Sequence, residues 1–406
     1  MELHGQKLFE FLKDRGLLYQ STNLEAVEKI LNSETPCTFY LGIDPTADAI
    51  HIGHLCSLRT FKYLQDAGHH GILVIGGATA HIGDPTGRRE MRSMITSEQI
   101  TKNIEQIKTL CKKFIKTEGE NAAIILNNND WMQGYSYIDF MRDVGVHFNV
   151  NVMLNTDACK SRLASGGLTF LEMGYSLIQA YDFETLYKKY NCTLQIGGSD
   201  QWANMVAGCD LIRKKYNSIV ETLTTPLLLN SKGEKMGKTT GGALWVSEDK
   251  VGAYDFYQYF INVSDEDVEK LLKWFSDYDN ATIAQIMHGD IREAKKIMAF
   301  EVTKLIHGEK NAKIAQQTAQ EIFSGKGESE NMANVLLDAK SDKINICTLL
   351  VDAKICQSKG EARRLIEQNG IAIGENKVKS IDQMIETKGE IIVHKGKKSH
   401  IKVVFN

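Results

Sequence analysis

The sequence predicts an α/β protein with a parallel sheet, followed by an α-helical domain and a small α+β domain. Over the first half of the chain, short apolar stretches rich in β-branched residues alternate with amphipathic helical patterns. That alternation is typical of a parallel sheet covered by helices. A mainly helical stretch, 254–321, comes next. From Lys343 onward, short helical and hairpin patterns indicate a separate small domain.

Size and charge allow several domains. The 406 residues exceed one typical domain, and 43% hydrophobic with 24% charged residues is ordinary for a folded protein. Residues 343–406 hold 12 Lys/Arg against 7 Asp/Glu, whereas the whole chain has a net charge of −3. A basic tail domain on an acidic body favours contact with a polyanion there, and a solvated basic surface is the alternative.

The N-terminus, the hydropathy and the cysteines predict a cytoplasmic protein. Residues 1–7 lack the pattern of a signal peptide, and no apolar run approaches the length of a membrane span. The eight cysteines form no Cys-x-x-Cys pair. We therefore expect buried free thiols in a reducing compartment, and no zinc site.

The first chemically informative segment is a strand, a polar loop and a helix. After a helical region over 6–32, residues 37–43 form an apolar run that predicts a buried strand, and a helix begins at about His51. The start of such a helix has unpaired N–H groups and a positive dipole end, which suit a phosphate. His51 and His54 lie one turn apart and can contact one anion. The alternative is that both are surface residues without a ligand. Gly53 between them favours close approach of a ligand.

Two further strands place polar loops at the same edge of the sheet. Strands are predicted over 70–76 and 122–126, with an amphipathic helix over 97–114 between them. The loop 82–89 combines small residues with arginines at phosphate range, and the loop 127–131 is rich in Asn. In open parallel sheets, ligands bind outside the carboxyl ends of the strands, so both loops are candidates for the binding site.

A helix predicted over 169–190 carries three polar residues on one face. Tyr175, Gln179 and Asp182 have the spacing i, i+4 and i+7. The helix is apolar on most other sides. A solvated face is possible, but this surrounding favours a polar pocket cut into the core.

The strand predicted over 193–196 is followed by Gly-Gly-Ser-Asp-Gln at 197–201. Glycines, then Ser at a helix start and Asp200 just inside, suit recognition of a ribose, because a carboxylate can accept from two hydroxyl groups. Taken alone, this signal is weak.

The strand predicted over 223–229 leads into a loop, 232–242, that is rich in glycine and lysine. Lys235 and Lys238 lie three residues apart in it. The composition predicts a mobile cationic loop, and a charged hairpin tip is the alternative.

These patterns divide the chain into three domains and a linker, without internal repeats. The predicted boundaries are 1–253 for the sheet domain, with a helical insertion at about 128–165, then 254–323 for the helical domain, 324–342 for the linker and 343–406 for the tail domain.

Several stretches together resemble bacterial tyrosyl-tRNA synthetases. Residues 39–54 contain Pro-Thr-Ala-Asp-Ala-Ile-His-Ile-Gly-His, which is similar to the first signature of class I aminoacyl-tRNA synthetases. Residues 235–239, Lys-Met-Gly-Lys-Thr, resemble the second signature in a form usual for tyrosyl enzymes. Residues 83–87 and 194–202 are similar to tyrosyl stretches, and the tail from about 345 resembles an S4-type RNA-binding module. The resemblance implies a Rossmann-like catalytic domain and an S4-like tail domain.

The resemblance also implies roles for individual residues. Tyr40 and Asp182 would hydrogen-bond the phenol of the substrate. The other residues implied for L-tyrosine are Asp84, Tyr175, Gln179 and Gln201. Those implied for ATP are Gly42, Asp44, His51, His54, Gly198, Asp200 and Lys238. Those implied for the departing pyrophosphate are Thr46, His51, His54, Arg88, Arg92, Lys235 and Lys238.

By the same resemblance, ATP would be used with Mg²⁺, tRNA(Tyr) would be the acceptor, and a homodimer would form through about 128–163. The alternative to the homodimer is a monomer in which this helical segment packs on its own sheet. The implied chemistry is attack of a carboxylate on the α-phosphorus of ATP. It needs no acid or base from the protein, so catalysis rests on positioning and on stabilisation of charge in the transition state.

Two alternative functions are open. The first is a catalytically inactive paralogue that binds RNA, which the intact His51/His54 and Lys235/Lys238 pairs disfavour. The second is a synthetase for tryptophan, which Asp182 disfavours because an indole offers one N–H and a bulkier ring. Phenylalanine would leave buried phenol-binding groups unpaired, a discrimination for which tyrosyl-tRNA synthetases are the known example.

Overall fold

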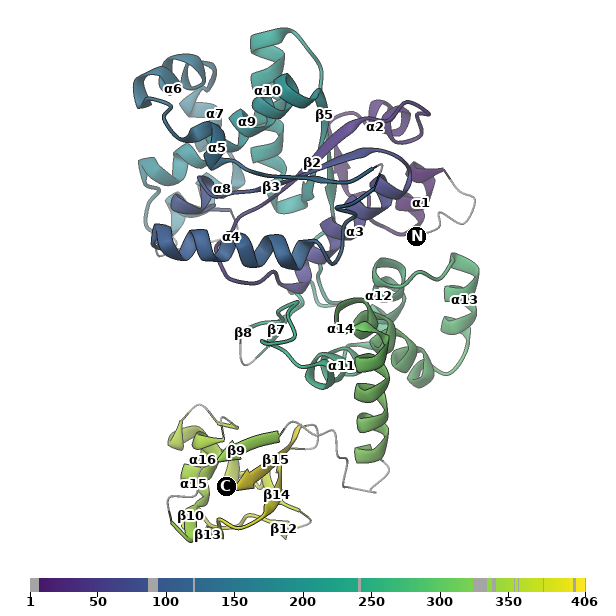
Figure 1. The fold of residues 1–406 in the computed structure, drawn as a ribbon, viewed down its shortest axis with the longest axis vertical. Helices are drawn as coiled ribbons and strands as arrows, with labels where there is room; N and C mark the ends of the chain where they lie inside the picture. The colour runs from purple at the N-terminus through teal and green to yellow at the C-terminus, as the bar shows by residue number, and fades with distance from the viewer. Residues whose placement is uncertain are drawn as a thin grey trace. The chain divides into compact units, whose positions relative to one another are not determined.

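A computed structural model of the chain describes residues 7–86, 94–119, 121–239, 242–323, 334–337, 341–353, 355–356, 358–374, 376–396 and 399–405. At residues 238, 239, 242, 323, 334, 399 and 400 it describes the backbone only. The chain forms two compact units (Figure 1), each described by itself below. The first combines Met1–Val251 with Val263–Ile306, and the second combines Gly252–Asn262 with His307–Asn406.

The first unit is built on a six-stranded sheet with the order β1-β6-β5-β2-β3-β4. Strands β2, β3 and β5 of this sheet are labelled in Figure 1. All neighbouring strands are parallel except β1, which runs antiparallel to β6. The predicted α/β fold class is therefore confirmed. The strands are β1 Gln20–Ser21, β2 Thr38–Ile43, β3 His70–Ile75, β4 Ile124–Asn127, β5 Cys192–Gly198 and β6 Glu221–Thr225.

Helices cover both faces of the sheet, and neighbouring residues of β2 show how. The Phe39 ring packs against Phe61 on one face, with 4.8 Å between ring centroids. The Tyr40 ring packs against Phe183 on the other face at 5.2 Å. Because side chains alternate along a strand, a strand buried on both faces is apolar throughout. Outside the insertion, the helices between the N-terminus and β6 are α1 Leu8–Asp14, α2 Leu24–Leu31, α3 Ile52–Asp66, α4 Ser97–Cys111, α9 Phe170–Tyr190 and α10 Trp202–Tyr216.

Short helices fill the predicted insertion between β4 and α9. They are α5 Asn129–Met132, α6 Tyr137–Asp143, α7 Val150–Leu154 and α8 Asp157–Ser165. A buried ion pair joins the insertion to the start of α9: Arg162 Nε donates to Glu172 Oε1 at 2.9 Å, and Arg162 Nη2 donates to Glu172 Oε2 at 3.2 Å. Thr169 and Glu172 form a capping box there, so the pair and the cap together define where α9 begins.

The helices after the sheet divide between the two units. α12 Val268–Phe275 and α13 Asn280–His288 belong to the first, whereas α11 Ala253–Ile261 belongs to the second. The long helix α14 Ile291–Phe323 is interrupted at Gly308, whose φ of 80° and ψ of 162° are not helical. No helix in the described ranges is long and apolar enough to cross a membrane.

The second unit contains a five-stranded sheet with the order β12-β11-β14-β15-β9 and a two-stranded sheet, β10-β13. The predicted hairpin over 370–378 is confirmed as β11 and β12. Strand β9 lies inside the stretch predicted as a linker, where it pairs in parallel with β15. The elements are β9 Asn334–Leu337, β10 Lys343–Asn345, α15 Ile346–Asp352, α16 Lys359–Glu367, β11 Ile371–Ile373, β12 Asn376–Lys377, β13 Met384–Glu386, β14 Glu390–Lys395 and β15 Ser399–Phe405.

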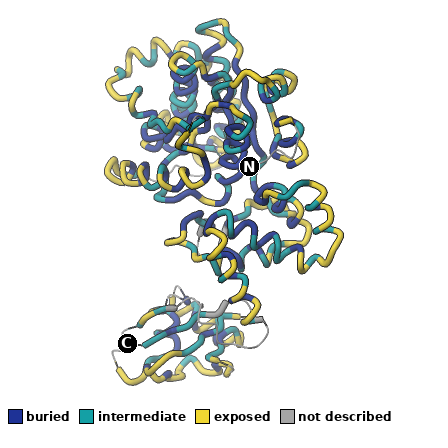
Figure 2. Tube along the Cα trace, turned by 45° about the vertical axis from the view of Figure 1, so that its right-hand side comes forward, coloured by how far each residue is buried: buried dark blue, intermediate teal, exposed yellow. Residues whose placement is uncertain are grey.

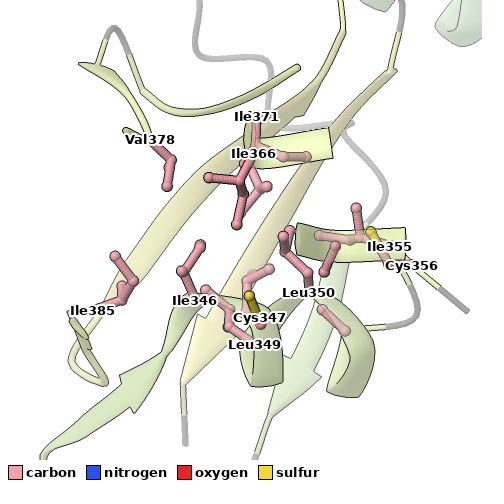
Figure 3. Packing of buried hydrophobic residues seen from close by; sticks show 14 residues of the cluster. Ile346, Cys347, Leu349, Leu350, Ile355, Cys356, Ile366, Ile371, Val378 and Ile385 are labelled. Carbon is pink, nitrogen blue, oxygen red and sulfur yellow. The ribbon is translucent and has the colours of Figure 1, made fainter. Parts of the chain in front are cut away.

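This unit has its own apolar core (Figure 3). Ile346 and Leu350 of α15 pack with Ile366 of α16 and Ile371 of β11. Each of these side chains is at most 2% exposed. In both units buried residues lie inside and exposed residues outside (Figure 2), as expected of units that each bury an apolar interior.

Candidate active site

A cavity of ≈ 920 Å³ lies at the carboxyl ends of the parallel strands, between the loops that follow β2, β3 and β5. Arg88 and Arg92 lie outside the described residues, and Lys238 is described by its backbone only. Every other residue proposed from the sequence lines this one cavity: Tyr40, Gly42, Asp44, Thr46, His51, His54, Asp84, Tyr175, Gln179, Asp182, Gly198, Asp200, Gln201 and Lys235. Their individual roles stay predictions.

Asp182 of α9 forms one end of the cavity. Its Oδ1 accepts from the indole Nε1 of Trp131 at 2.8 Å, and its Oδ2 accepts from Asn128 Nδ2 at 3.0 Å. Two neutral donors therefore fix the carboxylate and leave lone pairs on both oxygens for a ligand. Asn128 is in turn held by the backbone N–H of Ala78, which donates to its Oδ1 at 2.7 Å.

Tyr40 lies beside this carboxylate with its hydroxyl inside the core. Its side chain is 1% exposed, and the hydroxyl has no hydrogen-bond partner among the described residues. Burial and the nearby Asp182 raise the pKa of Tyr40 well above its usual value, so the hydroxyl keeps its proton. An unpaired buried hydroxyl is costly, and a ligand that carries its own hydroxyl group would pair with both Tyr40 and Asp182.

The ionisation of Asp182 predicts that binding of the phenol implied by the resemblance depends on pH. Burial, with a smaller contribution from the charge of Asp44, raises the pKa of Asp182 to about 7, against the opposing effect of the Asn128 and Trp131 hydrogen bonds. A phenol that donates to this carboxyl stabilises the ionised form, so binding lowers the pKa and releases a proton. We therefore expect the Kd for tyrosine to fall about tenfold as the pH rises from about 6 to about 8.

Calorimetric titration in two buffers of different ionisation enthalpy would measure both the affinity and the proton release. A Kd that stays constant across this pH range would contradict the assignment of the phenol to Asp182.

Two further carboxylates lie in the middle of the cavity. Asp44 accepts from the Tyr175 hydroxyl at 2.8 Å and from the Thr79 hydroxyl at 2.7 Å. Asp84 accepts from Gln201 Nε2 at 2.5 Å. A phenol and two carboxylates in one water-poor space form a suitable site for an ammonium group. The hydrogen bond from Tyr175 also brings Asp44, predicted only for ATP, into contact with a residue predicted for the amino acid.

Four polar residues of this site were not predicted individually: Thr79, Asn128, Trp131 and Gln195. Asn128 and Trp131 hold Asp182, and Thr79 holds Asp44. Gln195 is 2% exposed, lines the cavity, and lies opposite Tyr40 in the β2–β5 register. A position at the carboxyl end of a strand was the available signal for Asn128 and Trp131. The family-like stretch 194–202 was the available signal for Gln195, and nothing local distinguishes Thr79.

The two histidines cap α3 with their own rings. His51 Nδ1 accepts from the backbone N–H of Gly53 at 3.1 Å, and His54 Nδ1 accepts from that of His51 at 3.2 Å. The rings stack with 3.9 Å between centroids. Because each Nδ1 accepts a hydrogen bond, each neutral ring carries its proton on Nε2. The pair can therefore present two N–H donors at a helix start, an arrangement suited to an anion.

The lysine loop, defined here as residues 228–239, folds back on itself at the cavity mouth. Leu229 forms an isolated bridge with Lys235, and Met236 N donates to Leu228 O at 2.8 Å. Lys235 Nζ lies 3.7 Å from Asp200 Oδ2. Gly237 has a φ of +83°, and a Cβ built there would lie 2.5 Å from Ile52 Cγ2, so only glycine fits.

Backbone hydrogen bonds join the return arm of this loop to the start of α3. Leu244 N donates to Gly237 O at 2.6 Å, and Ile52 N donates to Leu244 O at 3.0 Å. Trp245 forms an isolated bridge with His51. The two motifs, nearly two hundred residues apart in the sequence, therefore lie side by side around one cavity. A parallel sheet whose cavity is lined by both a His-Ile-Gly-His motif and an adjoining Lys-Met-Gly-Lys loop defines a class I aminoacyl-tRNA synthetase.

Comparisons with known proteins narrow this class. Residues 32–324 match the family described as tRNA synthetases class I (W and Y), and residues 327–403 match the tyrosine–tRNA ligase SYY-like C-terminal domain. The tyrosine–tRNA ligase of Caldanaerobacter subterraneus subsp. tengcongensis is 45% identical over 400 residues, which cover 97% of this chain and 98% of that protein. That of Acetivibrio thermocellus is 46% identical over 405 residues, covering 98% of each.

A solved structure agrees with these relatives. A C-terminally truncated mitochondrial tyrosyl-tRNA synthetase of Aspergillus nidulans has a TM-score of 0.69 at 27% identity, covering 78% of this chain and 94% of that chain. The chain belongs to the tyrosine–tRNA ligase family, and the family predicted from the signature motifs is confirmed.

Proposed function

We propose that this chain is a tyrosine–tRNA ligase. It activates L-tyrosine with ATP, giving tyrosyl-adenylate and pyrophosphate, and then transfers the tyrosyl group to the 3′-terminal ribose of tRNA(Tyr). The observation that carries the proposal is the buried, unpaired hydroxyl of Tyr40 beside the carboxyl of Asp182, inside the cavity that both signature motifs line. The hydroxyl group of a phenol can pair with both Tyr40 and Asp182, whereas an indole or a phenyl ring has no hydroxyl group to do so.

In the activation step, an oxygen of the tyrosine carboxylate attacks the α-phosphorus of ATP, and the bond to the β,γ-pyrophosphate breaks. Both the nucleophile and the leaving group are already ionised, so the protein positions them and stabilises the developing charge. Asp84, Tyr175 and Gln179 hold the ammonium group, and Gln201 lies near the reacting carboxylate. Asp200 holds the ribose, beside Gly42, Asp44 and Gly198.

The cations and donors at the mouth act on the phosphates. Thr46, His51 and His54 bind the leaving pyrophosphate, and Lys235, Lys238, Arg88 and Arg92 close over it. Mg²⁺ bound to the ATP would neutralise part of the phosphate charge, and it would need only one or two carboxylates from the protein, because this ion keeps several waters. The basic tail domain, residues 343–406, contacts the tRNA backbone. The reaction takes place in the cytoplasm, a placement that the eight free cysteines support.

The test is ATP–pyrophosphate exchange, measured with each amino acid in turn and without tRNA. Exchange driven by tyrosine alone is the expected result. Exchange driven by tryptophan would keep the phosphate residues and overturn the assignment of Tyr40 and Asp182. A folded preparation that binds ATP and exchanges with no amino acid would instead support an RNA-binding paralogue.

We also propose a homodimer formed through the helical insertion. Support comes from large apolar side chains exposed on α6–α9, among them Tyr137 (61%), Ile138 (62%), Val152 (67%) and Phe170 (64%). Phe170 lies beyond the predicted interface of 128–163. Large apolar side chains exposed within one segment of the chain are typical of a protein–protein contact.

Sedimentation equilibrium of the full chain is expected to give twice the 45.5 kDa of one chain. Val152→Asp is expected to shift this to one chain, because a charge in an apolar interface is left unpaired. Ile219→Asp is the matched control, since Ile219 is 80% exposed and lies outside the insertion. A wild-type mass of 45.5 kDa would contradict the dimer.

A further inference from the structure

One end of helix α12 is attached to the lysine loop. Lys270 Nζ donates to the backbone carbonyl of Leu229 at 2.5 Å, and it pairs with Asp267 Oδ1 at 2.8 Å. Asp267 is 2% exposed, so its charge is held inside the protein next to the ammonium group. Leu229 lies on the outgoing arm of the loop, directly opposite Lys235. Lys270 of α12 therefore holds the outgoing arm of the loop, and Lys235 lies on the return arm that pairs with it.

The other end of α12 is attached to the helix that carries both histidines. Arg59 of α3 donates from Nη2 to Ser276 O at 3.2 Å and to Asp277 Oδ1 at 2.9 Å. The buried Arg15 donates from Nη1 to Ser276 O at 2.7 Å and to Lys273 O at 2.6 Å. Two buried guanidinium groups thus bind the carbonyl groups at the end of one helix, which suits the negative end of its dipole.

We infer that Lys270 is a positioning residue for the activation step: it fixes the base of the lysine loop on α12, which is itself fixed to α3. The inference rests on the proposed function, because the loop is expected to close on the pyrophosphate. A loop that closes needs one end that stays fixed relative to the histidines. Lys270 fixes that end of the loop and does not itself touch a substrate.

The turn of the loop is held by its own hydrogen bonds. Asn230 closes it, accepting on Oδ1 from the backbone N–H groups of Lys232 and Glu234. Gly233 and Gly237 have φ values of +78° and +83°, a conformation that other residues rarely adopt. The bond from Lys270 to Leu229 lies on the outgoing arm of this hairpin and not at its tip.

Three variants of the full chain test the inference in tyrosine-dependent ATP–pyrophosphate exchange. Lys270→Met removes the ammonium and keeps the stem, and Lys270→Arg keeps a donor. Lys273→Met is the matched control: it lies on the same helix and removes the same charge from an exposed pair with Glu269. We expect Lys270→Met to lower kcat about tenfold, the factor that one charge-assisted hydrogen bond represents, with the Kd for tyrosine unchanged.

Lys270→Arg is expected to recover most of this loss, and Lys273→Met to behave as the wild type. Equal kcat values for Lys270→Met and Lys273→Met would overturn the inference. So would a Lys270→Met variant whose tyrosine affinity falls in parallel with kcat, because that pattern indicates general damage to the fold.

A second measurement does not depend on activity. Amide hydrogen exchange at 229–239 is expected to be faster in Lys270→Met than in the wild type, and unchanged in Lys273→Met. The double variant Asp267→Asn/Lys270→Met removes the unpaired buried carboxylate that the single variant leaves. Its loop should still exchange fast, and slow exchange there would overturn the inference. If wild-type protein shows no tyrosine-dependent pyrophosphate exchange, the proposed function fails, and amide exchange still decides whether Lys270 holds the loop.

Discussion

Asp182→Ala is expected to lower kcat/KM for tyrosine by about 10²- to 10³-fold, which corresponds to about 3–4 kcal/mol and lies within the range for removing one partner of a buried charged interaction. The variant loses the acceptor for the phenol. It also removes the acceptor of the Trp131 indole N–H and one of the two acceptors of Asn128 Nδ2, the other being the Thr79 hydroxyl at 3.2 Å. Phenylalanine loses nothing by the change, so the preference for tyrosine over phenylalanine should fall with the activity.

The measurement is ATP–pyrophosphate exchange at varied tyrosine and phenylalanine concentrations, with thermal unfolding recorded alongside. Asp182→Asn is the matched control, because the amide has the same shape and its oxygen can still accept from Trp131 or Asn128. It should unfold closer to the wild-type temperature and still lose discrimination. A variant at this position that rejects phenylalanine as well as the wild type does would remove Asp182 from the phenol site.

Local patterns predict the part of the site that is continuous in sequence. The apolar run of β2, the turn at Asp44 and the stripe of α3 each depend on neighbours a few residues away, so the strand, the loop and the helix could all be predicted. The alignment of Tyr175, Gln179 and Asp182 follows in the same way from the helical repeat. All three line the cavity.

Strands whose partners lie far away in the sequence could not be predicted from local patterns. The sequence predicts a strand over 223–229, whereas strand β6 is Glu221–Thr225. The start of the strand was misplaced because Glu221 and Thr222 are polar, and yet both are buried. Their burial is explained by Thr22, whose hydroxyl donates to Glu221 and accepts from Thr222 N across about two hundred residues of sequence. Strand β9 was missed for the same reason, since its partner, β15, lies more than sixty residues further along the chain.

The residues that support Asp182 show the same limit at the level of side chains. Asn128 and Trp131 lie more than fifty residues before Asp182 in the sequence. The predicted strand end places both near the site, but it cannot say which side chain of the loop faces the carboxylate. The residues predicted to touch the substrate belong to motifs, whereas the residues that hold those motifs in place are scattered along the chain.

Lys235→Ala is the second variant with a large expected effect. We expect kcat for adenylate formation to fall about 10²- to 10³-fold, the range for removing one preorganised donor to developing charge, while the Kd for tyrosine stays unchanged. In the free protein Lys235 lies 3.7 Å from Asp200, and the lysine side chain is 51% exposed. An exposed pair of this kind contributes little to stability, so the variant should fold normally.

The loss should appear in kcat because the ammonium is needed most where the phosphate charge changes. If Asp200 holds the ribose, ATP competes with Lys235 for that carboxylate and frees the lysine for the pyrophosphate. Lys232→Ala is the matched control: it removes the same charge from the exposed turn of the same loop and should leave kcat within about twofold of wild type, as for most surface substitutions. Equal losses in Lys232→Ala and Lys235→Ala would mean that the loop acts through its overall charge, and would remove Lys235 from direct contact with the pyrophosphate.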